Sequence, residues 1–355
     1  MRNTIVHRIK DAAGAALTTL MAVATLSSCE YRDIWVEGHP YAQVKVSVDW
    51  SKLDEVPTGM TIMFFQRDTN NVVQKTSANI YAAEVGLKEG VWDAVVFNKS
   101  TVEFSNQAFR NIESFDDVET YLLPMLNQPA NTGDLYVEGR GVMEQPELIA
   151  VDTLRNINIT HQMVANSEIV NYDDWDGRTG RTTITLLTMH PDSVIYTLRI
   201  KVHVEGLQNM YSVIGSIDGL ASGFYMGQYV PTAKPAQCQI DNWEFTRLVG
   251  DSIGYITGEL KTFGIVNKET LLNKDVKLNL LFQLRDMIQT REYHYNVADL
   301  IVKDKKHKLL ELTINAEDKH PVLDNVKDNS NRNSTSGFDA VVEEWIKEPP
   351  VDIDM

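Results

Sequence analysis

The sequence is poor in cysteine and in positive charge. Its 355 residues contain two cysteines, Cys29 and Cys238, so a mature chain in which Cys29 is modified has no possible internal disulfide. The 33 lysines and arginines are outnumbered by 49 acidic residues, which gives a net charge of −16. A chain this acidic lacks the basic face that nucleic-acid binding requires, and we therefore expect no nucleic-acid partner.

The common motifs of catalysis and cofactor binding are also missing. The sequence has no G-x-S-x-G, no H-E-x-x-H, no P-loop and no G-x-G-x-x-G. His190, Asp192 and Ser193 are the three residue types of a hydrolytic triad, but they lie too close along one chain to adopt triad geometry. We therefore predict no catalytic residue and no cofactor.

Residues 173–180, DDWDGRTG, resemble a calcium-binding loop but lack its first and closing ligands. If Gly177 is the turn glycine, the first ligand position falls on Tyr172 and the closing position, which needs a bidentate glutamate, falls on Thr183. We interpret the stretch as an acidic turn and predict no metal site. A hydrolase with two carboxylates across a cleft stays open, although no residue pattern points to it.

The N-terminus has the pattern of a secretory signal peptide. Arg2, Arg8 and Lys10 precede an uncharged run over residues 12–26. As a helix this run would reach roughly 22 Å, short of the ~30 Å hydrocarbon core of a bilayer. A basic start, a short apolar middle and small residues at its end favour a signal peptide over a membrane span or a buried helix.

Leu26-Ser27-Ser28-Cys29 resembles the bacterial lipobox. The resemblance implies that the Cys29 thiol receives a diacylglycerol, that residues 1–28 are removed, and that the new amino group is acylated. Several acyl chains would hold the protein on a membrane without a transmembrane helix. Loss of three positive residues and one negative residue with the signal peptide changes the net charge from −16 to −18.

The rest of the chain is dominated by a period of two, which predicts an all-β fold. Apolar and polar residues alternate over 44–50, 196–204 and 276–284, as in antiparallel sheets that cover a core on one face. Shorter strands are predicted at 60–65, 92–97, 135–138, 184–187, 255–260 and 309–314. Many short strands separated by turns are typical of β-sandwiches. Little helix is expected, and the best candidate is 113–124, with Ser114 as cap and Pro124 as stop.

The mature chain is long enough for two domains, and the most turn-rich stretch, 173–180, is the predicted boundary. We therefore predict a signal peptide over 1–28, an N-terminal β-sandwich domain over 29–180 and a C-terminal β-sandwich domain over 181–355. Residues 338–345 fit either a helix or a terminal strand, and we favour a short strand packed on its own domain.

Three side-chain environments follow from these strands. Cys238 is predicted to be a small buried side chain in or beside a strand. His203 falls on the polar face of its strand and is expected to be solvated. Tyr172 and Trp175 lie on one acidic turn and form the best candidate for an exposed aromatic ligand platform.

Several longer segments resemble the fimbrillin-like (type V pilin) lipoproteins of Gram-negative anaerobes, and within them the anchor-like or uncharacterised fimbrial subunits. These segments are VKVSVDWSKLDEVPTGMTIMFF, GVWDAVVFN, FRNIESFDDVETY, VHVEGLQNMYSVIGSIDGLASGF, LKTFGI and GFDAVVEEWI. The resemblance implies two transthyretin-like β-sandwich domains and export as a lipoprotein. In polymerising members, a cut after an arginine removes the first strand, and a strand of the neighbouring subunit fills the groove.

The positions of the arginines in this chain depart from that scheme. Between Cys29 and the end of the first predicted strand the only arginine is Arg32, and the next is Arg67, beyond the second strand. A cut at Arg32 leaves the first strand in place, and a cut at Arg67 removes two strands. If the protease is arginine-specific, the chain keeps its lipid and its first strand.

The sequence thus predicts a non-catalytic fimbrial anchor or accessory subunit involved in cell adhesion. Its expected place is the outer membrane, held by lipid on Cys29 and exposed at the cell surface, and its expected partners are other fimbrial subunits joined by β-strand addition. The alternative is a surface glycan-binding lipoprotein that uses Tyr172 and Trp175.

Overall fold

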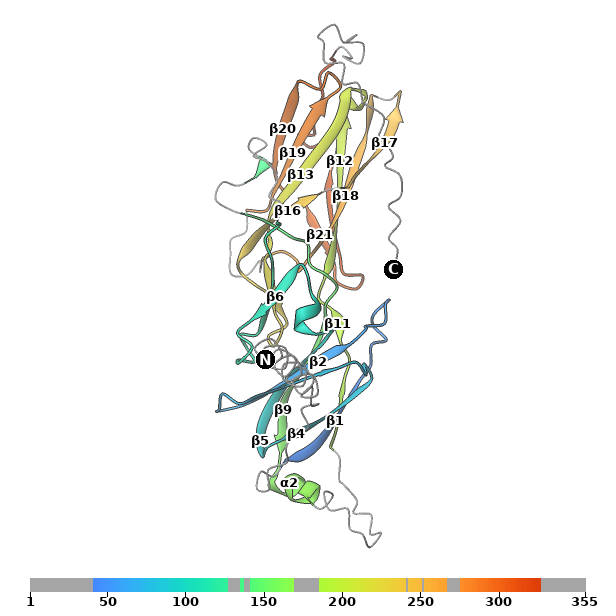
Figure 1. The fold of residues 1–355 in the computed structure, drawn as a ribbon. Helices are drawn as coiled ribbons and strands as arrows, with labels where there is room; N and C mark the ends of the chain where they lie inside the picture. The colour runs from blue at the N-terminus through green and yellow to red at the C-terminus, as the bar shows by residue number, and fades with distance from the viewer. Residues whose placement is uncertain are drawn as a thin grey trace, which may run out of the picture.

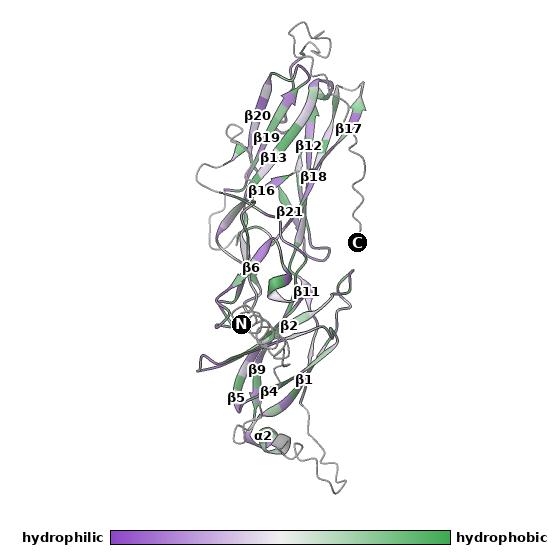
Figure 2. Ribbon diagram, in the orientation of Figure 1, coloured by the Kyte–Doolittle hydropathy of each residue, from purple (hydrophilic) through white to green (hydrophobic). Residues whose placement is uncertain are grey.

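The computed structural model describes residues 41–126, 135–136, 141–168, 185–240, 242–250, 252–266 and 275–326. Within these residues the fold is built almost wholly of β-strands, which confirms the predicted all-β class. The strands form an elongated molecule with one sandwich at each end (Figure 1). Hydrophobic and hydrophilic residues are interspersed along the strands of both ends, as expected of sheets with one covered face (Figure 2).

The first sandwich contains the first strand of the described chain. One sheet has the order β10-β1-β4 and the other has the order β11-β9-β5-β2-β3. Strands of the first sheet are β1 (Ala42–Val48), β4 (Ala82–Leu87) and β10 (Thr185–Met189). Strands of the second are β2 (Met60–Gln66), β3 (Val72–Ser77), β5 (Gly90–Asn98), β9 (Ala150–Ile159) and β11 (Asp192–Ser193). Helix α2 (His161–Glu168) follows β9 at the outer end of this sandwich (Figure 1).

The second sandwich is formed by two five-stranded sheets, with the orders β17-β18-β12-β22-β21 and β20-β19-β13-β16-β8. Strands of the former are β12 (Tyr196–Glu205), β17 (Trp243–Val249), β18 (Ile253–Thr262), β21 (Ile301–Asp304) and β22 (Leu309–Ile314). Strands of the latter are β8 (Val142–Met143), β13 (Met210–Ala221), β16 (Pro235–Ile240), β19 (Lys277–Leu284) and β20 (Thr290–Asn296).

A smaller four-stranded sheet, β15-β14-β7-β6, joins segments from distant parts of the chain. Its strands are β6 (Gln107–Arg110), β7 (Glu119–Leu122), β14 (Gly223–Tyr225) and β15 (Val230–Pro231). One hydrophobic cluster fills the first sandwich. A larger cluster runs through the second sandwich and this smaller sheet, and it reaches β2 and β5 of the first sandwich through Phe65 and Phe97. Strands β10 and β11 follow residue 180 in the chain but pair within the sheets of the first sandwich. The domain boundary near residue 180 stays a prediction, and so does the transthyretin-like assignment.

The helix predicted at 113–124 is wrong. A turn follows Ser114, and strand β7 occupies residues 119–122, paired with β6 in a hairpin. The backbone carbonyl oxygen of Ser114 does accept a helix-like hydrogen bond from Val118 N, at 2.9 Å. The Ser114 hydroxyl, however, donates to the Asp117 carboxylate at 2.7 Å instead of capping backbone N–H groups. Glu119 is buried and accepts two hydrogen bonds from Arg110. This interaction stabilises the paired strands against the local preference for a helix.

The predicted strand at 135–138 is also wrong over its two described residues. Leu135 is buried, and its carbonyl oxygen accepts hydrogen bonds from the side chains of Ser216, Gln237 and Asn279. Side chains of three neighbouring strands therefore satisfy this carbonyl, in place of a strand partner.

Candidate functional site

The residues that the sequence singled out for attachment and ligand binding lie outside the described part of the structure. Cys29 precedes residue 41, and Tyr172 and Trp175 fall within 169–184. The acidic turn at 173–180 and the terminal segment at 338–345 are outside it as well. These assignments stay predictions.

The first-strand position is described, and strand β1 fills it. β1 pairs with β4 in antiparallel register, from Ala42 opposite Leu87 to Ser47 opposite Ala82. On its other side it pairs in parallel with β10, from Val44 opposite Thr185 to Val48 opposite Met189. Backbone groups of β1 are therefore used on both sides, and the three-stranded sheet has no gap at this position.

The inward side chains of β1 are part of the core of the first sandwich. Ala42, Val44, Val46 and Val48 are at most 3% exposed, and they share one hydrophobic cluster with Phe64 and Trp92. Burial of a valine side chain contributes ~1.5–3 kcal/mol relative to exposure. Removal of β1 would therefore cost several kcal/mol and leave an open, apolar groove.

Arg67, the next arginine after Arg32, is engaged in the fold. It follows β2 and binds the Asp93 carboxylate with two hydrogen bonds, at 2.9 and 3.0 Å. The hydrogen bond to Asp93 raises the pKa of Arg67. A cut after Arg67 would detach both β1 and β2, and β2 is paired on both sides, with β3 and β5. The described fold thus has no arginine whose cleavage would release β1 alone.

Strand β17 is the opposite case, an edge strand with one partner. Among the described residues β17 pairs with β18 alone, at the end of its sheet. Phe245 and Leu248 are each 55% exposed. The strand is fastened by Trp243, whose ring covers Gly215 and Gly258 so closely that a Cβ at Gly215 would lie 2.5 Å from it. An exposed edge of this kind can pair with a further strand.

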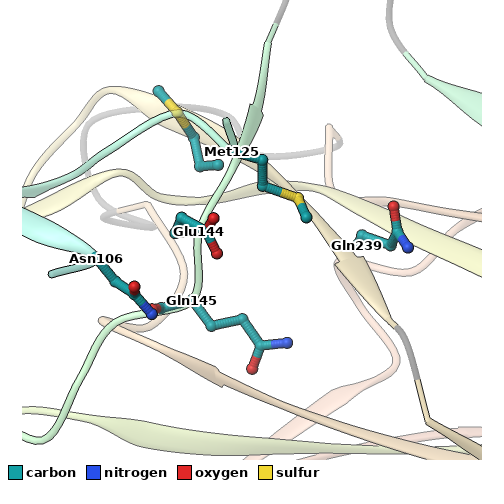
Figure 3. Close-up of a pocket in the computed structure, with 6 residues that line it drawn as sticks. Asn106, Met125, Glu144, Gln145 and Gln239 are labelled. Atoms are coloured by element: carbon teal, nitrogen blue, oxygen red, sulfur yellow. The ribbon is translucent and has the colours of Figure 1, made fainter. Parts of the chain in front are cut away.

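A pocket of about 230 Å³ lies beside β8 and β16 (Figure 3). It is lined by Asn106, Met125, Met143, Glu144, Gln145 and Gln239. Two of the lining residues are fixed by the fold: the Asn106 side chain donates to the Gln145 carbonyl at 3.1 Å, and the Gln145 side chain accepts from Lys261 N at 2.9 Å. Glu144 is the single carboxylate in the lining, so the pocket lacks the carboxylate pair of a glycosidase.

The residues of the apparent triad at 190–193 point to different partners. His190 faces Asp49 at 3.3 Å, Asp192 pairs with Lys308 at 3.2 Å, and the Ser193 hydroxyl lies near the Ile195 backbone. The three side chains therefore do not face one another in the described structure.

Cys238 matches its predicted environment. It lies in β16 and is 1% exposed. Burial raises the pKa of its thiol to about 12, so the side chain stays a neutral, inert thiol at pH 7.

His203 does not match its prediction. It lies on the outward face of β12 but is only 6% exposed, because Tyr255 packs edge-on at 5.4 Å and His320 at 4.7 Å between ring centroids. Burial lowers the pKa of His203, and the neighbouring His320 lowers it further. The period of two gave the correct face of the strand, but it contained no sign that the chain returns more than 100 residues later to cover it.

Comparison with known proteins places the chain in a family. The family described as "Domain of unknown function (DUF5119)" matches residues 28–241. The chain belongs to this family. In the part of the chain that the structure describes, no helix is long and apolar enough to cross a membrane.

A curated relative is the "Putative fimbrium anchoring subunit Fim4B" of Bacteroides ovatus, 25% identical over 213 residues. The match covers 60% of this chain and 55% of the relative, so the chain spans about half the length of the curated relative it matches. The predicted resemblance to fimbrial subunits of the anchor-like branch is confirmed.

A solved structure shares the fold. A "putative adhesin" from Bacteroides ovatus superposes with a TM-score of 0.56 at 20% identity, over 85% of this chain and 98% of the other. The fimbrial anchor protein Mfa2 from Porphyromonas gingivalis has a TM-score of 0.43 at 12% identity, over 76% of this chain and 90% of its own.

Proposed function

We propose that the protein is a non-catalytic fimbrial anchor or accessory subunit that works in cell adhesion. The observation that carries the proposal is that no arginine in the described fold would release β1 alone: the first one, Arg67, lies beyond β2 and is bound to Asp93, and β1 is paired on both sides. A subunit that keeps this strand offers no groove for a donor strand there. The relationship to a fimbrium anchoring subunit supports the same role.

Lipid on Cys29 would fasten the chain to the outer membrane. The support is the signal-peptide pattern and the lipobox resemblance in the sequence. Strand β1 begins at Ala42, 13 residues after Cys29, and 13 extended residues span at most ~45 Å. The first sandwich would therefore be the membrane-proximal end of the elongated molecule, and the second sandwich would project outward (Figure 1).

A neighbouring fimbrial subunit would join at the outer edge of β17. Strand addition needs a row of free backbone groups and pockets or contacts for alternate side chains. β17 has seven residues, belongs to the outward sandwich and carries the exposed Phe245 and Leu248. The other edge strand of the same sheet, β21, has four residues and offers a shorter ladder.

Surface glycan binding stays an alternative prediction. It depends on Tyr172 and Trp175, which lie outside the described residues. The structure supplies no observation that favours it over the fimbrial role.

Intact-mass and N-terminal analysis of the protein from its own membranes tests the proposal. We expect a chain that begins at an acylated Cys29 and still contains β1. A chain that begins after Arg67, or anywhere beyond Trp50, would mean that a strand is removed to open an acceptor groove. That result would replace the anchor by a polymerising pilin.

A further inference from the structure

Three metal-ligating side chains meet on the outer face of the second sandwich. His203 and Glu205 are two apart on β12, so both side chains leave the strand on the same face. His320 comes from the segment that follows β22. Two backbone hydrogen bonds hold that segment to the end of β12, from Glu205 N to Pro321 O and from Leu323 N to Glu205 O, each 2.9 Å.

The three side chains are close enough to share one ion. One ring nitrogen of each histidine and one Glu205 oxygen all lie within 4.8 Å of one another. The shortest of these contacts, from His320 Nε2 to Glu205 Oε1, is 3.0 Å. Tetrahedral zinc with bonds near ~2.0 Å sets neighbouring ligand atoms ~3.3 Å apart, so this pair is already at ligand spacing.

The hydrogen bonding of His320 directs its Nε2 at Glu205. Its Nδ1 lies 3.1 Å from the Asp318 carbonyl oxygen, which can only accept, so Nδ1 donates this bond. Its Nε2 lies 3.0 Å from Glu205 Oε1. A bond from Nδ1 to a backbone carbonyl is also the outer contact that orients histidines in metal sites.

His203 has a buried polar atom without a partner. Its Nδ1 has no hydrogen-bond partner in the described structure. Such an atom is costly to bury and rare in folded proteins, so it needs an explanation such as a bound ion. The ring of His320 packs edge-on against His203, 4.7 Å away between centroids, which places both imidazoles at one site. A cation among the three residues would give the buried His203 imidazole a partner.

We propose that His203, Glu205 and His320 form a binding site for a divalent transition-metal ion of the zinc class. Two imidazoles and one carboxylate suit zinc, whereas calcium and magnesium prefer sites made of oxygen alone. The proposal revises the expectation, drawn from the sequence, that the chain has no metal site. The third ligand lies 115 residues from Glu205, beyond the reach of any spacing motif.

The ion would fasten the segment after β22 to the sheet. Three protein ligands leave a fourth position for water or for a donor from another molecule. The ligand atoms of the three residues lie within 4.8 Å of one another, whereas zinc ligands are ~3.3 Å apart. Metal binding would therefore draw these side chains together by roughly 1.5 Å. The side chain of Glu205 is 45% exposed, so the ion can enter from solvent.

Calorimetric titration of the full chain with Zn²⁺ alone, after chelator treatment, tests the site. We expect one zinc per chain and a rise in melting temperature. Glu205→Gln keeps the size and shape of the side chain, and His320→Ala removes a ring. Each should weaken binding by at least ~10–100-fold, the loss that even a supporting residue of a metal site produces.

His307→Ala is the matched control, because His307 is an exposed histidine of the same sandwich paired with Asp304 outside the site. It should bind zinc as the unaltered chain does. Co²⁺ in place of Zn²⁺ should give the visible absorption of a four-coordinate site, lost in Glu205→Gln. Equal zinc affinity in the unaltered chain and in Glu205→Gln would overturn the proposal, as would a loss of affinity in His307→Ala of the same size.

Discussion

Strands β1 and β17 are each seven residues long and carry several apolar side chains, but their surroundings differ. β1 has a strand on each side and its inward side chains are at most 3% exposed. β17 pairs with β18 alone among the described residues, and Phe245 and Leu248 are each more than half exposed.

The difference separates a strand that completes a core from a strand that ends a sheet. Loss of β1 would expose apolar side chains and unpaired backbone together, so its position can be used for assembly only after a cut. Among the described residues, β17 has a strand partner on one side only, so its other edge is available without a cut. The comparison predicts that substitutions at β1 act on stability and that most substitutions at β17 act on assembly.

The largest effect is expected from a charge inside the β1 position. Val46→Asp places a carboxylate at a site with 0% exposure inside a hydrophobic cluster, which should destabilise the fold by at least ~3 kcal/mol. Ser47→Asp, one residue along on the outward face, is the control and should change little. Denaturant unfolding measures both. Equal unfolding midpoints for the two variants would break the comparison at β1.

A smaller effect is expected where β17 is fastened to its sheet. Trp243 is part-buried over Gly215 and Gly258 and donates to Ile240 O at 3.1 Å. Trp243→Ala should cost about 2 kcal/mol, less than the ~3–5 kcal/mol of a fully buried tryptophan, because β18 still holds the backbone. Thermal unfolding and amide exchange of β17 measure it. Unchanged exchange in β17 would show that the ring does not hold this strand.

The exposed aromatic of β17 should matter for assembly and hardly for folding. Phe245→Ser is expected to change the free energy of unfolding by less than ~0.5 kcal/mol and to reduce the number of fimbriae that cells retain. Val302→Ser, at a 65% exposed position of the other edge strand β21, is the control. If Val302→Ser reduces the count of fimbriae and Phe245→Ser does not, the docking edge is β21 and not β17.

The smallest effect concerns the end of β1. Hydrogen bonds from Ser51, and then the contact with His190, lower the pKa of Asp49 below its usual value. A depressed pKa contributes stability above the unfolded value of ~3.9, and this contribution is lost as the pH falls through the folded pKa. Asp49→Asn should therefore lower the melting temperature slightly at pH 7 and by less at pH 3. Asp54→Asn, an exposed carboxylate of the same loop, is the control. An identical loss at both pH values would mean that the Asp49 charge is not involved.

Strands with a clear period of two were predictable from the sequence. The alternation over 44–50, 196–204 and 276–284 corresponds to β1, β12 and β19, because one face of each of these strands packs on a core. The helix at 113–124 was mispredicted because Ser114, the following acids and Pro124 are local signals. The interactions that decide the segment reach beyond one helical turn: Arg110 binds the buried Glu119 across the β6–β7 hairpin, and β7 pairs with β14 more than 100 residues later in the chain.

The candidate sites, like the strands, divide into features that chain order predicts and features that depend on contacts between distant segments. Arg32 and Arg67 could be placed relative to the first strands from the sequence alone, and the ion pair of Arg67 with Asp93 then showed that this arginine belongs to the fold. The edge position of β17 was not predictable, because strand order does not follow from chain order. The meeting of His203 with His320 was missed for the same reason: spacing indicates which face a residue occupies, but not what later covers it.

A reversible lock on β1 tests the central claim most directly. Lys45 and Glu84 are opposite each other on β1 and β4, so Lys45→Cys with Glu84→Cys can form a disulfide that holds β1 in place. Retention of fimbriae is compared with Lys45→Cys alone and with a strain that lacks the chain. We expect the locked protein to retain as many fimbriae as the single variant. Loss of fimbriae in the locked protein, reversed by reduction, would mean that β1 must leave its sheet for assembly and that the protein is not an anchor of the kind proposed.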